Sequence, residues 1–428
     1  MKTIRTLPIE NGRGLRIKAI TILMGFMCFL MILPDDVFGW IPIYRSVTPS
    51  SISYRWLDFN FGIIQLFVLF IGVYYIVRLK KVAVFLLAVL MLIREFVYFI
   101  ISENNIFSVS AYEMYLTLFI GYAFVLWAEG GLKSLEECER YFKWFLISNM
   151  LTLYINFATG GSGGRLVGRY HSSNLDVGGT GTVCVLCILF LGFAKRKKWY
   201  DYLFVVLSIF GLLLSGSRAN LLLLAMILVL YYILHLFLKF KKETRGSDNR
   251  RVFFTRLLIV IFAIVGLIIG GYLYKDRLYN WILGSRFEAL LTSEGMRSDS
   301  SFIGRMASFT AGLDVLKYHP LGISGYFINL QMEMRMRGYP TFPHSTLLSM
   351  YLFFGPVVLI IYGIWISLLK RIRMIDVKYY MMILFLLIST IIYGGPIANF
   401  KIVFMILMTT FLARQVVMET QAEVNEEY

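Results

Sequence analysis

Long apolar runs alternate with short polar connectors along nearly the whole chain. A helix needs about 20 mainly apolar residues to cross the core of a bilayer. The pattern predicts twelve membrane-spanning helices, at about 17–33, 61–77, 82–101, 106–128, 142–159, 177–194, 202–217, 219–238, 255–274, 344–368, 379–394 and 400–415. Several runs are shorter than the bilayer requires, and the weakest are 202–217 and 379–394.

One connector is much longer than the others. Residues 275–343 form a 69-residue loop between the ninth and tenth spans. Within this loop, apolar residues recur at the spacing of an amphipathic helix, which His319-Pro320 ends: Phe302, Met306, Phe309, Leu313 and Leu316. An earlier stretch, 277–292, also has a helical pattern. We divide the chain into spans one to nine (1–274), the loop (275–343), and spans ten to twelve with a tail (344–428).

Composition supports a membrane protein and excludes several other classes. The chain is 58% hydrophobic and 16% charged, whereas soluble domains are about 45–50% apolar and 25% charged. Its net charge of +16 does not indicate nucleic-acid binding, because Lys and Arg lie between the apolar runs. We therefore predict an all-α, polytopic membrane helix bundle with one large, partly helical extracytoplasmic loop. Cys184 and Cys187 lie one turn apart in a span, which favours packing over a disulfide.

The connectors carry the positive charge unequally. With the N-terminus inside, the inside segments hold 27 Lys and Arg, and the short outside connectors hold six. Inside loops are enriched in these residues, so we predict both termini in the cytoplasm and the long loop outside. The first apolar run lacks a small-residue cleavage pattern and is interpreted as a span rather than a signal peptide.

The cations predicted outside are mostly arginine. That side has eleven Arg and three Lys, while the inside set has 13 Arg and 14 Lys. Arginine is preferred where a planar fork must hold phosphate or carboxylate oxygens. This bias favours a bound anion, and the alternative is compositional chance together with acidic partners in the loop.

Two outside segments are candidates for that anion site. Arg218 lies in the turn 215–220, where an arginine at the membrane edge is costly unless it is paired or lines a wet cavity. The loop 160–176 combines several glycines with Arg165 and Arg169, so its amides and arginines suit a phosphate. The alternatives are an arginine that snorkels to the interface and a flexible connector.

A candidate base lies at the mouth of span ten. His344 is one of four histidines, and a histidine near its ordinary pKa can accept a proton from an attacking hydroxyl. A capping or structural histidine is the alternative. Arg94 and Glu113 each lie roughly 10 Å deep from the outer side. We favour an ion pair between them, and the alternative is that Glu113 reaches a substrate hydroxyl.

The sequence has no Walker loop, no GxGxxG, no H-E-x-x-H and no D-x-D motif. Nucleotide-sugar chemistry and metal-dependent chemistry are therefore unsupported, and we expect no metal and no cofactor.

Four segments in order resemble the O-antigen ligase and Wzy-type polysaccharide polymerase superfamily. They are the Arg/Gly…Asn loop from Arg165 to Asn174, the small-residue turn before Arg218, Gly304-Arg305 followed by His319-Pro320-Leu321-Gly322, and His344-Ser345 followed by Gly355. The likeness is architectural over the whole chain and at motif level from about 160 to 360. The family usually has a small or aromatic residue where this chain has Val358, which departs from the ligase end of the family.

The resemblance implies sugar transfer at the outer face of the bacterial cytoplasmic membrane, from a glycan carried on a polyprenyl pyrophosphate. His344, Arg218 and Arg305 are then the expected catalytic residues. Arg165, Arg169, Asn174, His319 and Glu113 are the expected substrate-binding residues. Attack opposite the leaving group would invert the anomeric centre without a metal. Expected partners are lipid-linked donor and acceptor glycans, membrane lipids, and flippase and chain-length regulator proteins.

The function predicted is a Wzy-type polymerase of capsule, exopolysaccharide or O-antigen repeat units. A ligase that moves finished glycan to a lipid or protein acceptor is the alternative within the superfamily. A lipid-linked oligosaccharide flippase is more remote, because transporters more often show internal repeats and broken midplane helices.

Overall fold

The computed structural model describes residues 63–101, 109–132, 134–159, 170–172, 175–243, 300–323, 327–339, 342–392, 394 and 399–426. Within these ranges the regular structure is entirely helical. The predicted spans at 17–33 and 255–274, and the helical stretch at 277–292, lie outside the described residues.

The first seven helices in the described part of the chain follow the predicted spans two to eight. They are α3 (Ile63–Arg78), α4 (Val82–Ile101), α5 (Val109–Gly131), α6 (Leu135–Ala158), α7 (Val177–Gly192), α8 (Trp199–Ser215) and α9 (Arg218–Glu243). The later elements are α13 (Ser300–Tyr318), α14 (Phe327–Met336), α15 (Thr346–Phe354), the 3-10 turn η2 (Gly355–Val357), α16 (Val358–Ile372), α17 (Val377–Ile392) and α18 (Phe400–Glu426). The helix predicted in the long loop is confirmed as α13, although Met306 and Leu313 of its predicted apolar face are exposed. The helix α14 was not predicted.

Capping moves one helix start away from the apolar run. α6 begins at Leu135 rather than at 142, because the Ser134 hydroxyl accepts a hydrogen bond from the Glu137 amide at 3.2 Å. Glu136 and Glu137 also lie in the first turn of α6, where negative charge favours the positive end of the helix dipole. The polar first turns of α6 therefore belong to the helix.

The span predicted over 344–368 corresponds to a stretch long and apolar enough to cross a membrane, Thr346–Ile372, but this stretch is not one regular helix. α15 ends at Gly355, which has a φ of +71°, and the chain passes through η2 before α16 begins at Val358. Pro356 follows the glycine and has no amide hydrogen to donate, so a regular α-helix is interrupted here. The break leaves α15 as a half-length helix whose C-terminal carbonyls are available to side chains from elsewhere.

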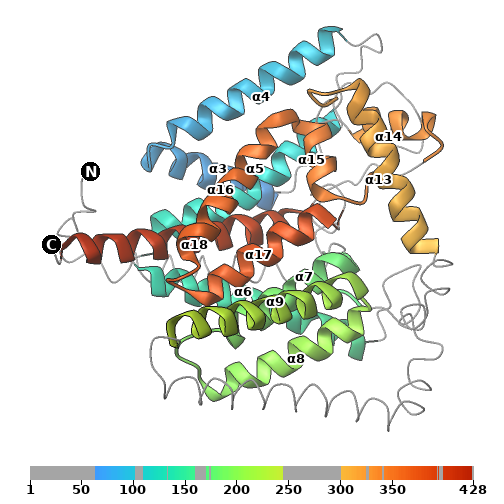
Figure 1. The fold of residues 1–428 in the computed structure, drawn as a ribbon. Helices are drawn as coiled ribbons and strands as arrows, with labels where there is room; N and C mark the ends of the chain where they lie inside the picture. The colour runs from blue at the N-terminus through green and yellow to red at the C-terminus, as the bar shows by residue number, and fades with distance from the viewer. Residues whose placement is uncertain are drawn as a thin grey trace.

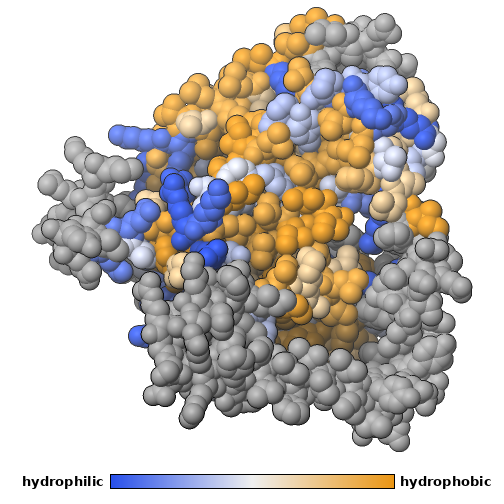
Figure 2. All heavy atoms as spheres, viewed as in Figure 1, coloured by the Kyte–Doolittle hydropathy of each residue, from blue (hydrophilic) through white to orange (hydrophobic). Residues whose placement is uncertain are grey.

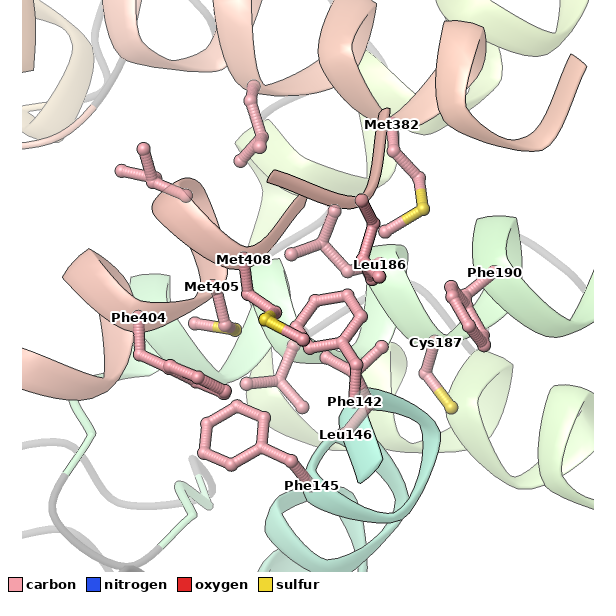
Figure 3. Packing of buried hydrophobic residues seen from close by; sticks show 14 of the residues in the cluster. Phe142, Phe145, Leu146, Leu186, Cys187, Phe190, Met382, Phe404, Met405 and Met408 are labelled. Atoms are coloured by element: carbon pink, nitrogen blue, oxygen red, sulfur yellow. The ribbon is translucent and has the colours of Figure 1, made fainter. Parts of the chain in front are cut away.

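The main core lies where α5, α6, α7, α17 and α18 meet. Figure 3 shows Phe142 and Phe145 of α6, Leu186 and Phe190 of α7, and Met405 of α18 gathered in this interior. Phe404 contributes the tightest aromatic pair there, with its ring centroid 4.7 Å from that of Phe145. Edge-to-face rings of this kind add about 0.5–1.5 kcal/mol per pair beyond the burial of their area. Cys184 and Cys187 are fully buried free thiols in this cluster, as predicted.

A second, smaller core lies under the helices of the long loop. It joins α13 and α14 to α15 through Val315, Leu330, Met334 and Phe353, which are all fully buried. In Figure 1, α13 and α14 lie at one end of the molecule, next to α15. The described helices of the long loop, α13 and α14, are thus packed onto the bundle rather than extended from it.

Apolar side chains cover most of the described surface on the face shown in Figure 2. Hydrophilic residues gather near the C-terminal end and around α13 and α14. By length and hydropathy, two described stretches are able to cross a membrane, Thr346–Ile372 and Lys401–Glu423, and five shorter apolar helices accompany them. For the other helices, membrane crossing stays a prediction.

Candidate active site

The long-loop helix α13 and the connector before α15 bring two predicted residues together. The backbone amide of His344 donates a hydrogen bond to the Ser308 hydroxyl at 3.1 Å. The same hydroxyl donates to the backbone carbonyl of Arg305 at 2.9 Å, and Ser308 is fully buried. Arg305 and His344, which are far apart in the sequence, therefore share one buried hydroxyl.

Close packing fixes this connector against α13. A Cβ atom on Gly312 would lie 2.6 Å from Cγ of Pro343 and 2.9 Å from Cδ2 of Leu348, so a larger residue does not fit there. Ser345 caps α15 by accepting from the amide of Leu348 at 3.3 Å, and it donates to the carbonyl of Ile391 in α17 at 2.8 Å. His344 is thus held from α13, α15 and α17.

The surroundings of His344 set its protonation. Its side chain is about half-buried, and burial followed by the nearby positive charge of Arg305 lowers the pKa of His344 below its ordinary value of 6.5. At neutral pH the imidazole is therefore neutral and able to accept a proton. A proton acceptor next to a permanent cation is a suitable arrangement for activating a hydroxyl beside an anionic leaving group.

Arg218 belongs to a different group of residues, at the α8–α9 turn. Gly216 ends α8 with a φ of +62°, a conformation that favours glycine, and Arg218 is the first residue of α9. Asn220 is fully buried and donates to the carbonyl of Gly178 and to the hydroxyl of Ser217, both at 2.9 Å. These bonds tie the Arg218 turn to the start of α7, and the Arg218 side chain is partly exposed.

The segment that follows the glycine-rich loop is anchored at the same turn. The amide of Tyr170 donates to the carbonyl of Leu214 in the last turn of α8, at 3.3 Å. The amide of Ser172 donates to the hydroxyl of Thr180 in α7 at 2.8 Å, and its hydroxyl lies 2.7 Å from that of Thr152. The C-terminal end of the predicted phosphate loop therefore lies beside the turn that carries Arg218.

Four predicted substrate-binding residues are not described in a way that tests them. Arg165, Arg169 and Asn174 lie outside the described residues. Glu113 lies in α5, but its side chain is not among those described. The favoured pairing of Arg94 with Glu113 is therefore untested, and one acidic partner that the structure does show for Arg94 is Glu95, at 3.0 Å.

His319 follows the last residue of α13 and lies in an ion-pair network of the loop. Its Nε2 is 3.5 Å from Glu333 Oε1 in α14. Arg337 completes the network by donating to Glu333 Oε2 at 2.6 Å and to Asp314 Oδ2 at 2.9 Å. His319 thus lies against α14 from the end of α13, and its predicted contact with substrate stays a prediction.

Two buried polar residues were missed from the sequence. Ser308 looked like one hydroxyl among several in the loop, and only the folded chain shows that it links Arg305 to His344. Lys401 was counted as an outside connector cation, but it is fully buried in the first turn of α18 and donates to Asn149 Oδ1 at 3.0 Å. A charged residue next to the long apolar run of α18 was the signal that should have identified it.

Residues 203–363 match the family model described as O-antigen ligase. The resemblance to the O-antigen ligase superfamily is confirmed. The matched segment runs from α8 into α16 and contains Arg218, Arg305 and His344. No protein in the curated set matches the chain. Similarity to this family over that segment supports a membrane enzyme of glycan transfer and does not distinguish a polymerase from a ligase.

Proposed function

We propose that this protein is a Wzy-type polymerase that joins polyprenyl-pyrophosphate-linked repeat units at the outer face of the bacterial cytoplasmic membrane. The observation that carries the chemistry is the shared Ser308 hydroxyl, which joins the backbones of Arg305 and His344, together with the positive charge of Arg305 acting on the His344 side chain. The match to the O-antigen ligase family over the same segment supports glycan transfer as the reaction class.

In the proposed reaction, a hydroxyl of the acceptor sugar attacks the anomeric carbon of the donor. The new carbon–oxygen bond forms while the bond from that carbon to the phosphate oxygen breaks, and the pyrophosphate leaves with the electron pair. The neutral imidazole of His344 takes the proton of the attacking hydroxyl. Arg305 and Arg218 are the cations proposed to stabilise the charge that develops on the pyrophosphate.

A cation is more useful here than a general acid. Pyrophosphate is already a good leaving group, so the enzyme gains little by protonating it. Fixed positive charge in a site shielded from water stabilises developing negative charge without reorganisation. Attack from the side opposite the pyrophosphate then inverts the anomeric centre.

The deciding experiment is a profile of lipid-linked oligosaccharides in a strain that lacks the gene. Single repeat units should accumulate on the polyprenyl carrier, because their joining is blocked. Long lipid-linked polymer would instead establish the ligase function. Repeat units trapped on the inner leaflet would establish a flippase and contradict glycan transfer by this chain.

A further inference from the structure

Arg94 reaches from α4 onto the ends of two other elements. Its Nη1 donates to the carbonyl of Phe353, near the C-terminus of α15, at 2.6 Å. Its Nη2 lies 3.3 Å from the carbonyl of Leu321, in the turn that follows α13. The same guanidinium is paired with Glu95, which also accepts a hydrogen bond from the hydroxyl of Tyr115 in α5 at 2.8 Å.

Two motif glycines meet at this position. Gly322 closes the His-Pro-x-x-Gly turn with a φ of +83°, and Gly355 ends α15 with a φ of +71°. A Cβ on Gly322 would lie 2.8 Å from the Leu352 carbonyl oxygen and 3.0 Å from Nη2 of Arg94. A Cβ on Gly355 would lie 2.5 Å from the Leu321 carbonyl oxygen. Both glycines therefore permit one close backbone contact between the loop and the α15–α16 break.

Direct hydrogen bonds complete the contact. The amide of Ile323 donates to the carbonyl of Leu352 at 2.6 Å. The hydroxyl of Tyr351 donates to the carbonyl of Pro320 at 2.8 Å. The carbonyl that Arg94 holds on α15 lies at the negative end of a helix dipole, where a cation is favourable. The guanidinium therefore suits this position in two ways, because its charge is favourable there and its length lets it contact both carbonyls.

The two elements joined by Arg94 are those that place the proposed catalytic pair. α13 carries Arg305, and His344 lies just before α15. Near the pair, α13 and the connector are joined through Ser308. At the far end they are joined through Arg94, so the packing of α13 on α15 is fixed at both ends.

We propose that Arg94 is a positioning residue for glycan transfer, which acts by keeping α13 in register with α15 so that Arg305 stays beside His344. This role rests on the proposed function. It requires the planar fork, because a lysine ammonium is a point charge on a flexible stem. Misplacement of catalytic groups by about 1 Å costs on the order of 100-fold in rate.

The test compares Arg94→Met and Arg94→Lys with Arg140→Met in purified protein. Arg140 is a matched control, since it also pairs with a helical glutamate, at 3.4 Å, but is largely exposed. The substrate is the lipid-linked oligosaccharide that accumulates in the deletion strain. We expect Arg94→Met to lower kcat by about 10- to 100-fold with little change in donor KM, and Arg94→Lys to restore only part of it. Arg140→Met should behave as wild type.

Two further measurements separate positioning from simple destabilisation. If α13 shifts, Arg305 moves away from His344, so the acid limb of the pH–kcat profile of Arg94→Met should move to higher pH. Hydrogen exchange of residues 300–323 should also become faster. Unchanged kcat and acid limb, or activity lost only in proportion to folded protein, would overturn the proposal. If Arg94→Met does not accumulate, Arg94→Lys decides by the same readouts.

Failure of the proposed function gives a different result. A fully active His344→Gln enzyme would contradict the role of His344 while leaving the exchange measurement interpretable. Faster exchange at 300–323 in Arg94→Met would then still show that the hydrogen bonds of Arg94 stabilise α13. Exchange at 300–323 equal to that of wild type would show that Arg94 does not stabilise α13, whatever the activity of the variant.

Discussion

His344 differs from an ordinary histidine because of two neighbours, the protein interior and Arg305. Both lower its pKa below 6.5. A base must be deprotonated to act, so activity should persist below pH 6.5 and fall only on the acid side of that value. Arg305→Met removes the repelling charge, which raises the pKa of His344 and moves the acid limb of the pH–kcat profile to higher pH.

Arg305→Lys is the matched control for this pH prediction, because it keeps the positive charge while replacing the planar guanidinium with an ammonium group. Its residual activity should show an acid limb close to that of wild type. An acid limb that stays in place in Arg305→Met would show that another group controls it.

Arg218 tests whether a fork or only a charge is needed at the α8–α9 turn. If it holds pyrophosphate, Arg218→Lys should be nearly as damaging as Arg218→Ala, with a loss of about 10²- to 10³-fold in rate. If it only snorkels to the interface, lysine should replace it at little cost, since both stems reach that far. Polymer length and donor-lipid binding, measured in membranes at matched expression, distinguish the two. In His344→Gln, donor binding should persist while turnover falls.

The α15–α16 break is the element that the hydrophobic pattern concealed. The apolar run continues across it, so the run predicts one span, and only the positive φ at Gly355 reveals two short helices. Apolar runs locate helices well because burial in lipid or core depends on hydropathy, as α4 and α7 illustrate. They do not determine backbone conformation at one glycine, nor the start of α6, which a single serine cap decides.

Gly355→Ala should therefore destabilise the protein. Gly355 has φ +71° and ψ −160°, a conformation that is essentially restricted to glycine. An L side chain there costs on the order of 1–3 kcal/mol, and the new Cβ would also meet the Leu321 carbonyl. Thermal unfolding in detergent should show a lower midpoint. Gly363→Ala in α16 is the control, because nothing lies within 4 Å of a Cβ there and alanine is the better helix former. Equal midpoints for the two variants would contradict the strained turn.

The sequence allowed individual residues of the candidate site to be predicted, but not how they meet in the folded chain. The residue types and motif spacing indicated Arg305 and His344, while their meeting through Ser308 depends on how α13 packs against Pro343. Arg94 shows the same limit. Its depth in α4 suggested a charge in need of a partner, and charge alone did not point to backbone carbonyls more than two hundred residues away.

On the scale of the whole molecule, orientation is the first property to test. Reporter fusions at Lys198, Asp248 and Arg373 should report cytoplasm, and a fusion at Arg297 should report the outside, because the connectors predicted inside carry most of the Lys and Arg. An outside signal at Asp248 would invert every later helix and place Arg305 and His344 on the wrong side for a lipid-linked donor.

The proposed chemistry also predicts how the whole enzyme responds to chelation. Arginine cations take the place that a divalent metal holds in many phosphate-transfer sites, so activity of the purified protein should survive EDTA. Loss of activity that Mg²⁺ or Mn²⁺ restores would contradict the charge assignment. A wash with EDTA followed by each metal separately is sufficient to decide.

The exposure of α4 has a consequence for how this chain can change over evolution. None of its described side chains is buried. Most positions in α4 therefore require an apolar residue but place no constraint on its shape. Substitutions among Leu, Ile, Val and Phe should accumulate there almost freely in related chains. Arg94 and Glu95 should remain as two fixed positions in an otherwise drifting helix, accompanied by glycine at the positions of Gly322 and Gly355.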